Sequence, residues 1–143
     1  MSKHYQRPAI IIVEDAPDMR ILVQRLIHGL TTDFDLIAVD QAAKALGHLD
    51  HRIVPLLITD YAMPEMDGLE LTRMVKSVSP ATTVLLITAH SSSEVRAQAH
   101  AAGADYFLAR GIKFCVDASQ NKHVSFFLAS LALQQRFRRR FLP

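Results

Sequence analysis

The chain has 143 residues, half of them hydrophobic and about a fifth charged, which suits one soluble globular domain with a sizeable core. A single cysteine, Cys115, excludes an internal disulfide, and no apolar stretch approaches the roughly 20 residues of a membrane span. The first residues also lack the apolar segment of a signal peptide, so we expect a cytoplasmic protein without a membrane partner.

Charge is distributed unevenly along the chain. Residues 1–109 carry nine basic and 13 acidic side chains, whereas residues 110–143 carry seven basic side chains and one acidic one. An arginine-rich end can contact nucleic acid or anionic lipid. We interpret it as a solvated helix end, because cations suit a helix C-terminus, and we expect no direct nucleic-acid binding.

Strand-like and helix-like segments alternate from residue 9 onward. Short apolar, β-branched runs predict buried strands at residues 9–13, 34–39, 54–59, 83–88 and 105–108. Amphipathic segments predict helices between them, over 15–29, 41–49, 68–78 and about 91–103. Five alternations of this kind predict an α/β fold with a doubly wound, five-stranded parallel sheet in the flavodoxin-like order 2-1-3-4-5.

The predicted helices carry recognisable ends and inward faces. Pro17 lies just inside the first helix, and Asp40 is expected to cap the second. Residues 91–94 offer caps for the fourth helix, which should end at Gly103. On the third helix the apolar pattern predicts an inward face formed by Leu69, Leu71, Met74, Val75 and Val78.

The last part of the chain predicts an extended C-terminal helix, from about residue 120 to residue 141. It has two displaced apolar stripes, one around Phe127 and one around Phe137. One stripe can cover the sheet, and the other needs a partner, so we expect that this helix could support a homodimer. We therefore divide the chain into a core, residues 1–118, and a long helix with a basic tail, residues 119–143.

Polar side chains follow four of the five predicted strands. Glu14 and Asp15 follow the first strand, Asp60 follows the third, Thr88 ends the fourth, and Arg110 follows the fifth. The carboxyl ends of parallel strands meet at one edge, where such sheets bind ligands. Carboxylates crowded together repel one another unless a cation relieves them, so this edge suits a divalent cation beside a phosphoryl group.

The same residues resemble the receiver domain of bacterial two-component response regulators. Asp60 begins the sequence D-Y-A-M-P-E-M-D-G, which is similar to the D-x-x-M-P-x-M-D-G motif of that family. The acidic pair at 14–15, the Thr-Ala pair at 88–89 and the segment G-A-D-Y-F-L at 103–108 complete the resemblance, which covers residues 9–110. Because four motifs occur in the family's order within a five-fold β/α pattern, the resemblance is specific.

The resemblance implies a role for each matched position. Asp60 would accept a phosphoryl group from a histidine kinase or phosphotransfer protein. Glu14, Asp15, Asp60 and the backbone carbonyl of Ala62 would hold Mg²⁺. In the remaining positions, Thr88 would bind a phosphoryl oxygen and Phe107 would be the aromatic switch. The protein would then be a phosphorylation-controlled signalling switch and not a turnover enzyme.

The chain departs from the family at the end of the fifth strand, where Arg110-Gly111 replaces Lys-Pro. Arginine keeps the charge but is longer and forked, so it could grip a phosphoryl oxygen or turn away. The alternative is therefore a pseudo-receiver, an interaction module independent of phosphorylation. A haloacid-dehalogenase-like phosphatase would need a second aspartate two residues after Asp60, where the chain has Ala62. No glycine pattern indicates a nucleotide site.

Overall fold

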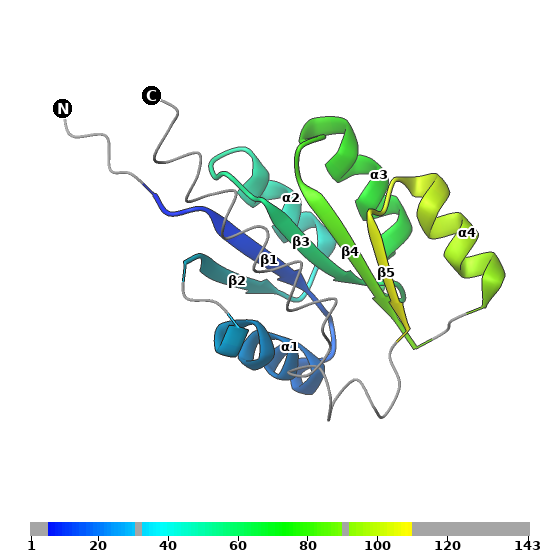
Figure 1. Cartoon of the computed structure of the whole chain (residues 1–143), viewed down its shortest axis with the longest axis horizontal. Coiled ribbons are helices and arrows are strands. Elements are labelled where there is room, and N and C mark those ends of the chain that lie inside the picture. The colour runs from blue at the N-terminus through cyan, green and yellow to red at the C-terminus, as the bar shows by residue number, and fades with distance from the viewer. Residues whose placement is uncertain (1–5, 31–32, 90–91, 110–143) are drawn as a thin grey trace.

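The computed structural model describes residues 6–30, 33–89 and 92–109, and these form a three-layer α/β fold (Figure 1). The strands are β1 (Ala9–Val13), β2 (Asp35–Val39), β3 (Leu56–Asp60), β4 (Thr83–Thr88) and β5 (Tyr106–Ala109). The helices are α1 (Pro17–Leu30), α2 (Ala42–Leu49), α3 (Gly68–Val78) and α4 (Ser93–Ala102). The predicted C-terminal helix, and with it the division at residue 118, lies outside the described residues.

The five strands form one sheet in the order β2-β1-β3-β4-β5, with every neighbouring pair parallel. This confirms the predicted fold class and strand order. Because β1 lies between β2 and β3, the carboxyl ends of β1 and β3 are adjacent at the point where the strand order reverses. None of the helices in the described ranges has the length and apolarity needed to cross a bilayer.

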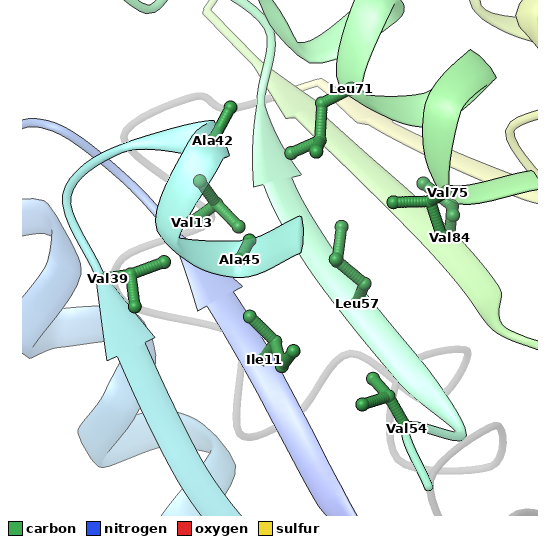
Figure 2. Close-up of a cluster of buried hydrophobic side chains, with 10 residues drawn as sticks. All are labelled: Ile11, Val13, Val39, Ala42, Ala45, Val54, Leu57, Leu71, Val75 and Val84. Atoms are coloured by element: carbon green, nitrogen blue, oxygen red, sulfur yellow. The ribbon is translucent and has the colours of Figure 1, made fainter. Parts of the chain in front are cut away.

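The two faces of the sheet are covered by different helices. On one face, Val23 and Ile27 of α1 pack on alternate residues of the central strands, including Ile10 and Ile58. On the other face, α2 and α3 pack on the intervening residues (Figure 2), in a cluster of Ile11, Val13, Val39, Ala42, Ala45, Val54, Leu57, Leu71, Val75 and Val84. Because helices cover both faces, the central strands β1, β3 and β4 are buried almost throughout, and the close packing holds their ends in place.

Helix ends follow the predictions with one exception. Ser92 caps α4 by accepting a bond from Val95 N, and Gly103 ends the helix with φ of 100°, a conformation that favours glycine. The prediction that Asp40 caps α2 is wrong, because Gln41 occupies the N-cap position and its side chain makes no capping bond. Asp40 instead accepts a hydrogen bond of 2.7 Å from Lys44.

The buried face of α3 differs from its predicted face. Met74 and Val78 are 40% and 62% exposed, so their predicted inward positions are wrong. The buried stripe runs through Leu71, Thr72 and Val75, spaced as one helical face requires. Thr72 fits this apolar position because its hydroxyl donates a 2.7 Å bond to the carbonyl oxygen of Gly68, one turn earlier.

Candidate functional site

Three carboxylates meet at the carboxyl edge of the sheet. Glu14 and Asp15 follow β1, and Asp60 is the last residue of β3. The register pairs Val13 with Thr59, so the residues that come next on the two strands lie side by side. One carboxylate oxygen from each of the three lies within 4.8 Å of the other two. The structure therefore brings together the acidic residues predicted from the strand ends.

Two of these carboxylates are buried, which makes their crowding costly. Glu14 is 5% and Asp60 is 8% exposed, and Asp15 lies nearer the solvent. Backbone amides support the buried pair: Ala16 N donates to Glu14 Oε1 at 3.1 Å, and Tyr61 N donates to Asp60 Oδ1 at 2.8 Å. Close carboxylates repel one another in a low-dielectric setting. A cluster of hard oxygen ligands at this spacing fits Mg²⁺, whose charge offsets that repulsion.

The loop after Asp60 folds back against the strand that carries it. Gly68 N donates to Tyr61 O at 2.9 Å, and Gly68 packs directly on the carbonyl of Asp60. A Cβ atom at position 68 would lie far inside van der Waals distance of that oxygen, so only glycine fits. Asp67 then caps α3 by accepting a 2.8 Å bond from Glu70 N. The Asp-Gly end of the motif thus holds the loop against Asp60.

Thr88 and Phe107 lie on the two strands beyond Asp60. Thr88 is the last residue of β4 and is 1% exposed, one position after Ile87, the register partner of Asp60. Phe107 lies on β5, opposite Leu86, and is partly buried against the α3–α4 cluster. The guanidinium of Arg96 on α4 lies 5.0 Å from the centre of its ring, within the range of a cation–π contact.

The two remaining predicted site residues are Ala62 and Arg110. Ala62 is exposed and follows Asp60 by two positions, in the loop that leads to α3. Arg110, which stands in place of the family lysine, lies outside the described residues. The structure therefore places the acidic residues and Thr88 at one edge and leaves the predicted role of Arg110 as a prediction.

A family model described as the response regulator receiver domain matches residues 10–114, well over half of the chain. The chain belongs to this family. Its receiver domain is 32% identical over 114 residues to two-component response regulator ORR1 of Oryza sativa subsp. japonica, covering 73% of this chain and 49% of ORR1. It is 30% identical over 105 residues to transcriptional regulatory protein ZraR of Escherichia coli O157:H7, covering 73% of this chain and 23% of ZraR. The chain spans about half or less of the length of these relatives.

Solved structures share the receiver fold. The signal receiver domain of an HD domain-containing protein from Pseudomonas fluorescens Pf-5 gives a TM-score of 0.73 at 23% identity, covering 91% of this chain and 99% of that chain. Response regulator protein TrrA of Thermotoga maritima, in complex with Mg²⁺-BeF, gives 0.66 at 22% identity, covering 81% and 97%. At these identities the likeness shows the fold alone.

One residue beside the receiver's acidic cluster is not indicated by the sequence pattern. Arg20 lies on the first turn of α1, and its Nη1 donates to Glu14 O at 2.9 Å and to Asp15 O at 3.4 Å. Nothing in the spacing of residues 14–20 predicts this contact, because a long side chain on a first turn usually extends into solvent. The helix start at Pro17 places position 20 near the end of β1, but not the direction in which its side chain turns.

Asp40 lies at the same edge of the sheet, after β2, and its charge is paired separately. The hydrogen bond from Lys44 lowers the pKa of the Asp40 carboxyl below its ordinary value, and the nearby charges of Lys44 and Arg20 act in the same direction. Asp40 is therefore ionised at neutral pH and paired with Lys44, and it lies outside the three-carboxylate cluster.

Proposed function

We propose that this receiver domain is a phosphorylation-controlled switch in which Asp60 accepts a phosphoryl group from a phosphohistidine, with Mg²⁺ required. The observation that carries the proposal is the cluster of Glu14, Asp15 and Asp60, whose carboxylate oxygens lie within 4.8 Å of one another at a rigid strand end. Burying a carboxylate is costly, and both hydrogen bonds and a nearby cation offset that cost; at this strand end Asp60 is also positioned to act as a nucleophile.

The transfer needs little covalent machinery. A carboxylate oxygen of Asp60 attacks the phosphorus atom, the P–N bond to the donor imidazole breaks, and the leaving nitrogen takes a proton. The product is an acyl phosphate on Asp60. Mg²⁺, held by Glu14, Asp15, Asp60 and the carbonyl of Ala62, would supply charge neutralisation for the phosphoryl oxygens. The chain's own contribution is to hold Asp60 still, through Tyr61 N and the close packing of Gly68.

The response to phosphorylation would pass to the neighbouring strands. Thr88 ends β4 beside the acidic cluster, so its hydroxyl is a suitable donor to a phosphoryl oxygen. Phe107 lies on the next strand with no hydroxyl of its own, and any change at Thr88 would reach it through packing. Arg110 would supply the cation that the family draws from lysine. Each of these would bias the β4–β5 face toward one of two conformations.

The partners follow from this chemistry. A histidine kinase or a phosphotransfer protein would donate the phosphoryl group, in the cytoplasm where such donors act. Relatives named as transcriptional regulatory proteins, such as ZraR, extend well beyond the matched region. We also propose a homodimer through the segment 119–143. Light scattering at high concentration, with and without a phosphodonor, should show a dimer, and a monomer under both conditions would contradict that part.

Phosphorylation by a small donor tests the proposal. The protein is incubated with acetyl phosphate and Mg²⁺, and intact mass spectrometry follows addition of one phosphoryl group. We expect a Mg²⁺-dependent adduct that is lost on adding a chelator, is labile to hydroxylamine, and is absent in Asp60→Asn. Asp67→Asn is a matched control, because Asp67 is an acid of the same loop that caps α3. No adduct on the wild type would leave an interaction module that works without phosphorylation.

A further inference from the structure

The turn between β1 and α1 is held by one side chain. The Nη1 atom of Arg20 donates to two successive carbonyl oxygens, Glu14 O at 2.9 Å and Asp15 O at 3.4 Å, while the next carbonyl, Ala16 O, accepts the ordinary helical bond from Arg20 N at 2.9 Å. The backbone ladder between β1 and β2 reaches Glu14, whose N–H donates to Val39 O at 3.0 Å. After the end of the strand, the carbonyl oxygens of Glu14 and Asp15 both accept from the guanidinium of Arg20.

This turn carries two of the three clustered carboxylates. The carbonyl and the side chain of one residue leave the same Cα atom, so fixing the carbonyls of Glu14 and Asp15 restricts the directions of their carboxylates. Ala16 N, in the same turn, donates to Glu14 Oε1 at 3.1 Å and extends this restraint to the side chain. A loose turn would let the carboxylates move apart and relieve their mutual repulsion.

A guanidinium beside a cation site has two effects of opposite sign. Its charge repels Mg²⁺ and lowers metal affinity, whereas its grip on the turn preorganises the ligands and raises metal affinity. Both bonds from the Arg20 guanidinium go to backbone oxygens, so the carboxylate oxygens of Glu14 and Asp15 are left available to a metal as far as Arg20 is concerned. That geometry favours preorganisation over competition.

We propose that Arg20 is a positioning residue, which holds the β1–α1 turn so that Glu14 and Asp15 point at Asp60 and bind Mg²⁺ together. The inference rests on the proposed Mg²⁺ site. It assigns Arg20 no contact with the metal or the phosphoryl group. Removing the Arg20 side chain should raise Mg²⁺ affinity if charge repulsion dominates and lower it if preorganisation dominates, so a measurement of Mg²⁺ binding separates the two effects.

The first test is a Mg²⁺ titration without a phosphodonor, followed by the amide NMR shifts of Ala16 and Tyr61. We expect Arg20→Ala to weaken Mg²⁺ binding by about tenfold, the usual effect of removing a residue that orients metal ligands. Arg20→Lys keeps the charge but not the fork, and it should lie between the two. The control is Arg25→Ala, which removes an exposed cation from the same helix and should leave the affinity within twofold of the wild type.

The second test needs no metal. Amide hydrogen exchange of Ala16, whose N–H binds Glu14 Oε1, should accelerate several-fold in Arg20→Ala and stay unchanged in Arg25→Ala. Unfolding curves identify any variant that loses its fold. If Arg20→Ala does, Arg20→Lys is compared with the wild type in its place. If Arg20→Ala binds Mg²⁺ as tightly as the wild type, or more tightly, the inference is overturned and the proposed function stands. If the wild type itself binds no Mg²⁺, both fail.

Discussion

The two edges of the sheet use charge in opposite ways. At the carboxyl edge, Glu14, Asp15 and Asp60 are crowded within 4.8 Å, and the neighbouring Arg20 binds backbone oxygens. At the other edge, Lys76 of α3 meets Asp105, just before β5, at 2.6 Å. The three-carboxylate cluster brings groups of one sign together, whereas the Lys76–Asp105 contact pairs opposite charges.

The Lys76–Asp105 pair ties three elements together. Lys76 Nζ also donates to Thr82 O at 2.7 Å, and the same Asp105 oxygen accepts from Val84 N at 2.9 Å. The end of α3 is thereby joined to the starts of β4 and β5. This edge contributes to stability, whereas the carboxyl edge brings groups of like charge close together, at a cost in stability that the proposed Mg²⁺ would offset.

The largest effect is expected from Gly68→Ala. The new methyl group would overlap the Asp60 carbonyl oxygen, so the loop must move away from β3. We expect a loss of about 3 kcal/mol in the free energy of unfolding and a much weaker response to Mg²⁺. Chemical denaturation with and without Mg²⁺ measures both quantities.

Gly47→Ala is the matched control for that variant. Gly47 lies inside α2, and a Cβ atom there has no neighbour within 4 Å. Because alanine is the better helix former, this variant should gain about 0.5–1 kcal/mol and respond to Mg²⁺ as the wild type does. Equal losses in the two glycine variants would show that Asp60 and its loop are not packed as described.

A smaller effect is expected from Lys76→Met at the paired edge. The change leaves Asp105 and Thr82 O without their cation, and we expect a loss of about 2 kcal/mol, limited by the partial exposure of both side chains. Mg²⁺ affinity should be unchanged, since the site lies at the opposite edge. A fall in Mg²⁺ affinity that matches the loss of stability would show that the two edges are not independent.

The smallest effect, and one of opposite sign, is expected from Asp15→Asn without metal. Among the described residues, the Asp15 side chain accepts no hydrogen bond, so the change removes a nearby like charge without breaking a hydrogen bond there. We expect a gain of roughly 1 kcal/mol, the size of a Coulomb term between nearby charges in a water-like dielectric. Denaturation in a chelator at low salt measures it. A clear loss would mean that the cluster is not repulsive.

Much of the fold follows from local patterns in the sequence. The strands at 9–13 and 83–88 and the helix at 68–78 match their predicted ranges, because apolar runs and strong end signals coincide there. β3 begins two residues later than predicted, at Leu56. Val54 and Pro55 are buried and apolar, as in a strand. Proline has no N–H for a ladder bond, so these two residues are buried without belonging to the paired strand.

The acidic cluster was predictable because strand order fixes which strand ends are neighbours. Contacts made by long side chains were not predictable, since they depend on the path that each side chain takes. Arg20 reaches back over its own helix start, Lys76 joins Asp105 across 29 positions, and Arg96 lies over Phe107. Spacing along the chain indicates which face a residue occupies, but not which way a flexible side chain turns.

The most direct test of the account is the free energy of unfolding as a function of Mg²⁺ concentration, for the wild type and Asp15→Asn. The wild type should start less stable and gain about 2.7 kcal/mol at one hundred times its dissociation constant. Asp15→Asn should start more stable and hardly respond, so the two curves cross. Asp50→Asn, which removes an exposed charge away from the cluster, should follow the wild type. Parallel responses of the wild type and Asp15→Asn would contradict a metal site built from these carboxylates.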